Sequence, residues 1–112
     1  MDKRQIITLC GSTRFKQQFE EVNKQLTLRG DIVLSVGVFG HQLPMEEQKS
    51  IFANTSVKEN LDQLHLDKID MSDAIMVINV DGYIGHSTQK EINYANKHNK
   101  TIYYLEPQDD NQ

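Results

Sequence analysis

The sequence predicts an α/β fold: a single doubly wound domain with a mostly parallel sheet of four strands in the order 2-1-3-4 and helices on both faces. Two patterns predict it. Four short apolar runs are separated by longer segments with helical spacing, and strands that alternate with helices form parallel sheets. The 112 residues suffice for one domain, which we expect over residues 1–106, with residues 107–112 as a polar tail.

The first half of the chain has the pattern of a strand, a helix and a second strand. Residues 5–10 (QIITLC) form a β-branched run that ends at Gly11. Residues 31–36 (DIVLSV) form the second run, after a helix stop at Gly30. Residues 13–29 lie between them as an amphipathic helix, because their apolar side chains recur at spacings of four, three and four: Phe15, Phe19, Val22 and Leu26.

The second half repeats the alternation of helices and strands. It begins with a loop over residues 37–45 that contains two glycines and a proline. The elements expected after the loop are one or two helical turns in 46–54, a helix over 55–73, a strand over 74–80, a helix over 87–99 and a strand over 101–105.

Composition narrows the classes of function. The formal charge is −4 and the chain has no basic run, which argues against nucleic-acid binding. No apolar run approaches the roughly 20 residues of a membrane helix, so no membrane partner is expected. One cysteine cannot form an internal disulfide, which fits a cytoplasmic protein. The four histidines lack paired spacing, so the sequence predicts no metal site.

Two loops are the most site-like stretches of the chain. In the strand order 2-1-3-4, the first and third strands flank the point at which the connections reverse direction, and ligands bind at the carboxyl edge of such a point. The loops that follow these two strands are residues 11–14 and residues 81–87. We therefore expect one cleft between them.

The first of these loops, Gly11-Ser12-Thr13-Arg14, has features of an anion site. A turn at glycine lets backbone amides approach a ligand, and the next helix points its positive end at the same place. Ser12 or Thr13 supplies a hydroxyl, and Arg14 can hold a phosphate or carboxylate through two hydrogen bonds. The alternative is that Ser12 or Thr13 only caps the helix and that Arg14 is solvated.

The second loop leads to the residue best suited to chemistry, Glu91. The dipole of its helix favours an ionised carboxylate, and such a group in a cleft can attack a sugar C1′ atom. The alternative is a capping box, in which Thr88 and Glu91 bond to the backbone of their own helix start. Tyr83 would orient a carboxylate or stack on a base, or else is a half-packed loop residue.

Three motifs together resemble the nucleoside 2-deoxyribosyltransferase-like superfamily. They are residues 10–15 (CGSTRF), residues 68–74 (KIDMSDA) and residues 82–95, which hold GYIG, then Ser87-Thr88, then EINYA. The resemblance covers residues 5–106 and is strongest to small members such as the 2′-deoxynucleoside 5′-monophosphate N-glycosidases. It implies a flavodoxin-like (Rossmann-like) sheet, a homodimer, no cofactor, and cleavage or exchange of the N-glycosidic bond of a nucleoside or its monophosphate.

The resemblance also implies roles for individual residues. Glu91 matches the nucleophile, which would attack C1′ in a double displacement like that of retaining glycosidases. Gly11, Ser12 and Arg14 match the loop that holds the 5′-phosphate. The residues that would close this phosphate pocket from the other side are Gly85, Ser87 and Thr88.

The acid/base partner departs from the family pattern. Family members carry an aspartate about two turns before the position of Asp73, and the corresponding residue is His65. Asp67 and His65 are the candidates for this role, and each is alternatively an ordinary helix residue. His41 and His86 lie on predicted rim loops and can protonate a leaving base, because histidine titrates near neutral pH.

Two functions are therefore consistent with the sequence, beside a purely structural role as a dimer subunit, which predicts no stabilisation by any ligand. The first is an N-glycosidase or deoxyribosyltransferase. The second is a binding module that senses a nucleotide without converting it, which the absence of an acid at residue 65 favours. Cys10, at a strand end and without a neighbouring base in the sequence, is expected to be a core residue and not a nucleophile.

Overall fold

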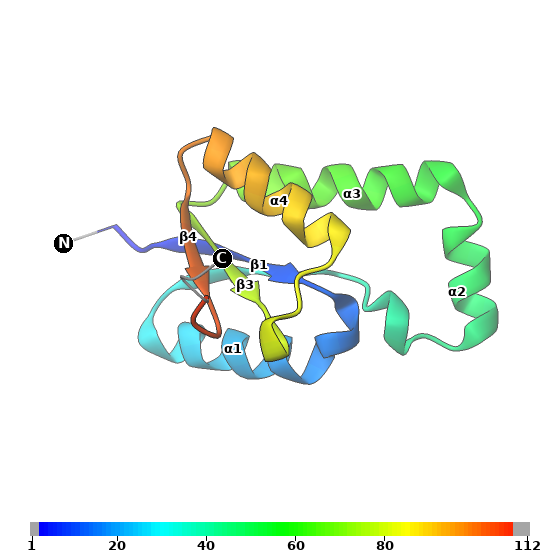
Figure 1. Ribbon diagram of the computed structural model, residues 1–112, viewed down its shortest axis with the longest axis horizontal. Helices are drawn as coiled ribbons and strands as arrows, with labels where there is room; N and C mark the ends of the chain where they lie inside the picture. The colour runs from blue at the N-terminus through cyan, green and yellow to red at the C-terminus, as the bar shows by residue number, and fades with distance from the viewer. Residues whose placement is uncertain (1–2, 109–112) are drawn as a thin grey trace.

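The computed structural model describes residues 3–108 and confirms the predicted sheet. Four parallel strands have the order β2-β1-β3-β4 (Figure 1). The strands are β1 (Ile6–Gly11), β2 (Ile32–Leu34), β3 (Ala74–Ile78) and β4 (Thr101–Tyr104). In the central pair, Ile7 lies opposite Ala74. Of the predicted tail, residues 109–112 lie outside the described residues.

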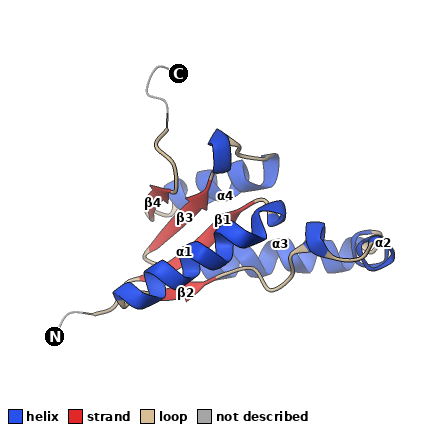
Figure 2. Ribbon diagram, turned by 90° about the horizontal axis from the view of Figure 1, so that it is seen from below, coloured by secondary structure: helices blue, strands red, loops and turns tan. Residues whose placement is uncertain are grey.

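The helices lie on both faces of the sheet, as predicted. α1 (Lys16–Arg29) covers one face, and α3 (Thr55–Asp70) and α4 (His86–Lys97) cover the other (Figures 1 and 2). α2 (Met45–Phe52) joins β2 to α3 and stands away from the sheet at one end of the molecule. None of the residues of α2 is buried.

The two faces of β1 build two separate cores. Ile7 and Leu9 point to α1, and Cys10 points to α3 and α4, because successive side chains of a strand alternate between faces. The α1 side also contains the predicted helix positions Phe19, Val22 and Leu26. The other core contains residues from α3, β3 and α4: Ile69, Ile75, Val77, Ile92 and Ala95.

Several elements are shorter than the sequence pattern predicts. β2 ends at Leu34, two residues early, and the carbonyl of the next residue, Ser35, accepts a hydrogen bond from Lys68 (2.6 Å). β3 ends at Ile78 because the chain then turns through left-handed conformations at Asp81 (φ 54°) and Gly82 (φ 79°).

The helices begin and end at different residues from those predicted. The predicted helix over residues 13–29 opens as a 3-10 turn, Thr13–Phe15, so α1 starts only at Lys16. α3 ends at Asp70 instead of residue 73, because Asp73 already pairs with the backbone of Ile6 in β1. α4 begins one residue earlier and ends two residues earlier than predicted.

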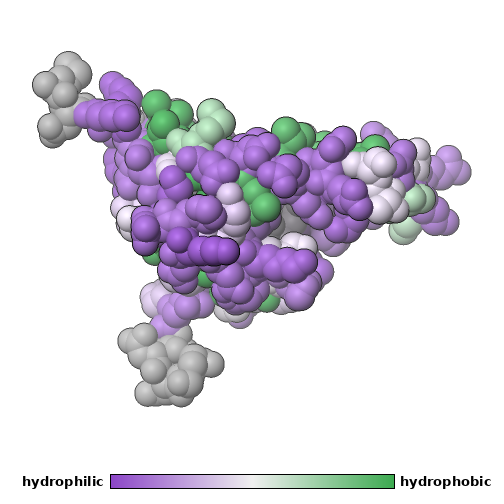
Figure 3. Space-filling model, turned by 90° about the horizontal axis from the view of Figure 1, so that it is seen from above, coloured by the Kyte–Doolittle hydropathy of each residue, from purple (hydrophilic) through white to green (hydrophobic). Residues whose placement is uncertain are grey.

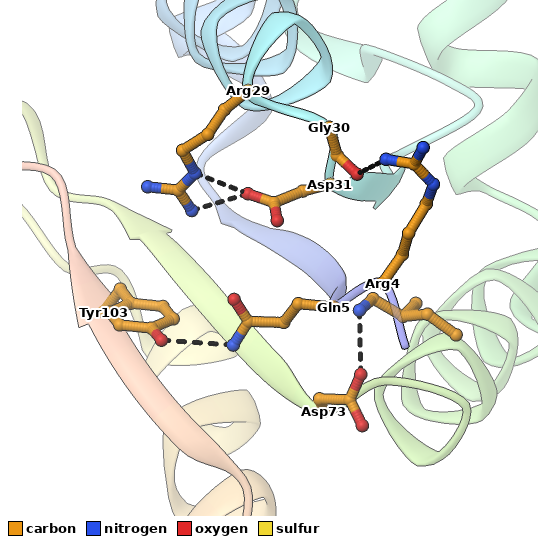
Figure 4. Close-up of polar contacts among 8 residues, drawn as sticks. Arg4, Gln5, Arg29, Gly30, Asp31, Asp73 and Tyr103 are labelled. Carbon is orange, nitrogen blue, oxygen red and sulfur yellow. Dashed lines mark hydrogen bonds and ion pairs between the residues drawn. The ribbon is translucent and has the colours of Figure 1, made fainter. Parts of the chain in front are cut away.

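Polar contacts hold the amino ends of the strands together (Figure 4). The carboxylate of Asp73 accepts a hydrogen bond from the backbone N–H of Ile6 (2.8 Å), at the start of β1. Arg4 donates to the carbonyl of Gly30 (2.8 Å), and Gln5 donates to the hydroxyl of Tyr103 on β4 (3.1 Å). Because these contacts occupy the amino edge, the loops at the carboxyl edge are the ones free to form a site.

At the carboxyl edge, the buried side chain of Asn79 continues the sheet beyond β3. Its Nδ2 donates to the carbonyl of Glu106 (2.9 Å), and the N–H of Glu106 donates back to its Oδ1 (2.8 Å). The carboxylate of Glu106 accepts a further hydrogen bond from the N–H of Asp81 (3.0 Å). The segment after β4 is thereby fastened to the loop after β3.

The surface over α3 and α4 is largely hydrophilic, with scattered apolar side chains (Figure 3). The exposed large apolar residues on α2 and α3 are Met45, Phe52 and Leu64. Among residues 3–108, no helix is both long enough and apolar enough to cross a membrane.

Candidate active site

A cavity of about 460 Å³ lies where the sequence predicts a cleft, beyond the carboxyl ends of β1 and β3. Four segments form its walls: residues 11–14, the loop after β2, one face of α3 together with Phe52, and the chain from Tyr83 into α4. Its volume falls within the about 300–1,000 Å³ typical of small-molecule sites. The two loops expected to face each other therefore line one cavity.

The first loop is held in place by the loop after β2. Ser12 accepts a hydrogen bond from the N–H of Arg14 (3.3 Å) and caps the 3-10 turn. Capping is the alternative role that the sequence allowed for this residue. The hydroxyl of Thr13 contacts Nδ1 of His41, and Gln42 donates to the carbonyl of Arg14 (3.3 Å). Ser12 and Thr13 also line the cavity, so these contacts leave both side chains within reach of a ligand.

Arg14 and Tyr83 form a pair across the cavity mouth. The guanidinium carbon of Arg14 lies 4.8 Å from the ring centroid of Tyr83, a cation–π arrangement. Phe15 packs edge-on against the same ring, at 6.0 Å between centroids. The Tyr83 ring thus holds the exposed Arg14 side chain at the cavity, so Arg14 is not merely solvated.

The start of α4 forms the opposite wall. Gly85 is the N-cap residue and provides no side-chain cap, so the first N–H groups of the helix point beyond its end without one. Gly85, Ser87 and Thr88 all line the cavity, as predicted, and so does His86. The helix end therefore adds partial positive charge to this wall.

The structure contradicts the capping-box interpretation of Thr88 and Glu91. α4 begins at His86, so Thr88 lies inside the helix and is buried. The carboxyl group of Glu91 faces α3 instead of the backbone of its own helix, with Oε1 3.8 Å from Nε2 of His65. The helix starts three residues too early for Thr88 to be its cap, and the N-cap residue is Gly85 instead.

Glu91 meets two further functional side chains at the inner end of the cavity. Nε2 of His65 lies 3.5 Å from Sγ of Cys10, at the end of β1. The ligand atoms of Cys10, His65 and Glu91 all lie within 4.8 Å of one another. The spacing of these residues in the sequence, which argued against a metal site, gave no sign of this cluster.

Burial sets the charges of His65 and Glu91. The pKa of Glu91 is raised from 4.5 to about 7, chiefly by burial, with a hydrogen bond from Cys10 that opposes the shift and the negative charge of Asp62 that adds to it. Burial lowers the pKa of His65 from 6.5 to about 4, and the positive charge of Lys68 acts in the same direction. At neutral pH the imidazole is therefore uncharged, and the short contact between them is not an ion pair.

Cys10 is a core residue, as predicted. Its side chain is fully buried, and burial together with the carboxylate of Glu91 raises the pKa of the thiol well above its usual value. The nucleophilic form of cysteine is the thiolate, which this environment disfavours. Cys10 also does not line the cavity, so it is not the nucleophile of this site.

The two candidates for the acid/base role lie in different places. His65 lines the cavity, whereas Asp67 lies outside it and accepts a hydrogen bond from Gln63 (2.9 Å) on the exposed side of α3. Residues two apart on a helix point in nearly opposite directions, so only one of the pair can face the cleft. Asp67 therefore points away from the cavity.

Helix α3 contributes three charged cavity residues that sequence reasoning missed: Lys58, Asp62 and Lys68. With His65 they follow spacings of four, three and three, which is one face of a helix. Choosing His65 as the residue that faces the cavity would have identified all three. Lys58 and Asp62 contact each other on this face (3.2 Å).

The cavity is more positive than the chain as a whole. Its permanent cations are Arg14, Lys58 and Lys68, against the carboxyl groups of Asp62 and Glu91. Near pH 7 Glu91 is about half protonated, because its pKa is about 7. A protein with a formal charge of −4 thus concentrates positive charge at this one site, which suits an anionic ligand.

Comparisons with protein-family models and with curated proteins find no match for this chain.

Proposed function

We propose that this protein hydrolyses the N-glycosidic bond of a deoxynucleoside 5′-monophosphate, with Glu91 as the nucleophile. The observation that carries the proposal is the position of Glu91, which lies in a cavity between the loop of residues 11–14 and a buried imidazole. A monophosphate is favoured over a free nucleoside because three permanent cations and a helix N-terminus line the cavity.

The proposed reaction has two steps. Glu91 attacks C1′, an ester bond to the sugar forms, and the N-glycosidic bond breaks with its electron pair leaving on the base. The base takes a proton from a rim histidine, and both candidates, His41 and His86, line the cavity. Water then attacks C1′ and gives its proton to the same histidine, and the bond from C1′ to Glu91 breaks, which releases the Glu91 carboxylate and deoxyribose 5-phosphate.

His65 serves as a positioning residue in this proposal. Its neutral imidazole fills the place that an aspartate holds in the resembled family, and it packs beside the nucleophile without adding a second negative charge. A second carboxylate at this distance would raise the pKa of Glu91 further and reduce the fraction of ionised nucleophile. The histidine thus favours the ionised form of Glu91 relative to an aspartate.

The test is to incubate the protein with each deoxynucleoside 5′-monophosphate and to measure free base by chromatography. We expect base release, reduced at least about a thousandfold in Glu91→Gln, because removal of a nucleophile abolishes the covalent route. Glu59→Gln, an exposed change on α3, is the control and should retain activity. Absence of base release with every monophosphate would rule out the hydrolase.

The second candidate is a nucleotide-binding module without turnover. It is favoured by the neutral state of His65, which cannot donate a proton to a leaving base near pH 7. Thermal-shift measurements separate the two functions, because a ligand that binds only the folded state stabilises it whether or not it reacts. If monophosphates stabilise the wild type and Glu91→Gln equally, and no base is released, the protein is a binding module.

A further inference from the structure

Cys10, His65 and Glu91 form a cluster of three different metal-ligand types. The cluster lies where the end of β1 meets α3 and α4, at the inner end of the cavity. Sγ of Cys10 is 3.5 Å from Nε2 of His65, and that nitrogen is 3.8 Å from Oε1 of Glu91. All three ligand atoms lie within 4.8 Å of one another. The proposed glycosidase reaction makes no use of the thiol.

We propose that this cluster, which we call the Cys-His-Glu site, binds Zn²⁺ and that the bound ion inhibits the protein by occupying the carboxylate of Glu91. The binding stands on the geometry of the three side chains alone. The inhibition, in contrast, rests on the proposed function, in which the same carboxylate must attack the sugar.

Two of the three distances in the cluster, those from His65 Nε2 to Cys10 Sγ and to Glu91 Oε1, are close to those of a tetrahedral zinc site. Zinc bonds of about 2.3 Å to sulfur and about 2.05 Å to nitrogen, at a tetrahedral angle, place those two atoms about 3.6 Å apart. The observed separation of Cys10 Sγ and His65 Nε2 is 3.5 Å. The same calculation gives about 3.3 Å between nitrogen and oxygen. A rotation of the Glu91 side chain that moves Oε1 by a few tenths of an ångström shortens the observed 3.8 Å to that value.

The chemistry of the ligands selects Zn²⁺ over the hard cations. Thiolate and imidazole are ligands of zinc and similar borderline-soft ions, whereas Mg²⁺ and Ca²⁺ require more oxygen ligands than this cluster has. One thiolate and one carboxylate also neutralise the charge of the ion, so the occupied site holds no net charge in its buried position. His65 and Glu91 line the cavity, which leaves the fourth coordination position open to it.

Binding requires the loss of protons. The S–H bond of Cys10 breaks, a zinc–sulfur bond forms, and the proton passes to the buffer. Any proton on Glu91 leaves in the same way. The ion supplies the positive charge that the buried cluster otherwise lacks, so it stabilises the thiolate that burial disfavours.

Cobalt(II) is the probe for the binding, because it occupies zinc sites and absorbs light. We expect a Co²⁺ titration of metal-free protein to give intense visible d–d bands, typical of tetrahedral coordination, and a thiolate-to-cobalt charge-transfer band in the near ultraviolet. Zn²⁺ added afterwards should remove both. Weak octahedral bands without charge transfer would overturn the proposal.

Variants identify the ligands. Cys10→Ser and Cys10→Ala should lose the charge-transfer band, and His65→Gln should weaken binding at least about tenfold, the lower end of the cost of losing even a supporting residue. His98→Gln, far along α4 from the cluster, is the matched control and should bind like the wild type. Circular dichroism confirms that each variant is folded. A charge-transfer band retained in both folded Cys10 variants would refute the site.

The inhibition has its own readout. Zn²⁺ at the concentration that saturates the cobalt-competition curve should stop base release from the monophosphate, and a chelator should restore it. Cys10→Ala should also release base, but its inhibition should require a Zn²⁺ concentration at least about tenfold higher. Base release unchanged by saturating Zn²⁺ would overturn the inhibition. If no base is released even with chelator, the glycosidase fails and the cobalt spectrum still decides the binding.

Discussion

Nε2 of His65 and Oε1 of Glu91 lie 3.8 Å apart, yet the two groups are not oppositely charged near neutral pH. Burial displaces both pKa values toward the uncharged forms, to about 4 for the imidazole and about 7 for the carboxyl group. The cluster thus keeps a carboxyl group poised between protonated and ionised at physiological pH. That is the state in which a small change of environment alters its charge most.

The stability of the metal-free protein should depend on pH through Glu91. Its pKa rises from 4.5 to about 7 on folding, so the folded state holds a proton that the unfolded chain has released. The resulting stabilisation is complete below pH 4.5 and is lost as the pH rises through about 7. Glu91→Gln stays neutral and should be more stable than the wild type at high pH, by at most about 3 kcal/mol.

Urea denaturation with a chelator present measures this difference. Wild type and Glu91→Gln should have similar free energies of unfolding at about pH 4.5 and diverge toward about pH 8.5. His65 titrates in both proteins, so its contribution largely cancels from the comparison. Glu59→Gln, at an exposed position of α3, should follow the wild type throughout. A constant difference between wild type and Glu91→Gln at all pH values would mean that Glu91 is not buried as described.

Arg14 should determine the affinity for the phosphate group. Arg14→Ala removes a charge-assisted hydrogen-bond donor worth about 1.5–3 kcal/mol, so KM for a monophosphate should rise about 10- to 100-fold. The value of kcat should change less, because Arg14 lies at the mouth and Glu91 at the inner end of the cavity. Lys97→Ala, at the other end of α4, is the control with the same loss of charge. Equal effects of the two variants would contradict a specific phosphate contact.

Gly11 should be intolerant of a side chain, because β1 and β3 are packed closely at its position. A Cβ atom there would lie 3.0 Å from Cβ of Ile78 and 3.4 Å from Cε2 of Phe19. Gly11→Ala should lower the free energy of unfolding by about 1–3 kcal/mol, as overpacking does. Gly37→Ala is the control, since a Cβ atom there has no neighbour within 4 Å. Equal denaturation midpoints for both variants would count against this packing.

A homodimer, expected from the resemblance, should use the side of the molecule formed by α2. No residue of α2 is buried, and Met45, Phe52 and Leu64 expose 64%, 43% and 53% of their surfaces. Pairing of two copies would cover these apolar side chains. Size-exclusion chromatography with light scattering should give twice the mass of one chain, and Met45→Glu with Leu64→Glu should give the monomer. A monomeric wild type at micromolar concentration would contradict the dimer.

The sequence was sufficient for the sheet because apolar periodicity and glycine stops are local signals. The strand order followed from the same pattern, since right-handed crossovers leave few arrangements for four strands. The element ends were less accurate. Asp73 ends α3 early through a contact with Ile6, 67 positions away in the chain, which depends on the fold.

Only part of the site could be predicted, because its other contacts depend on the folded chain. The two loops could be found from their place after β1 and β3, but Glu91 matched a capping box equally well, and only the true start of α4 decides between the two roles. The contact between Cys10 and His65 joins residues 55 positions apart. No spacing rule reaches that far, because the contact exists only once α3 has packed on β1.

The pairing of Asn79 with the backbone of Glu106 makes the cavity vulnerable to trimming of the chain from its carboxyl end. A carboxypeptidase that removed Glu106 would leave all four strands intact but deprive Asn79, which is 1% exposed, of both hydrogen-bond partners. Asp81 would lose its partner at the same time, and the turn that leads to Tyr83 and Gly85 would loosen. Loss of Glu106 would thus loosen one wall of the cavity while sparing the sheet.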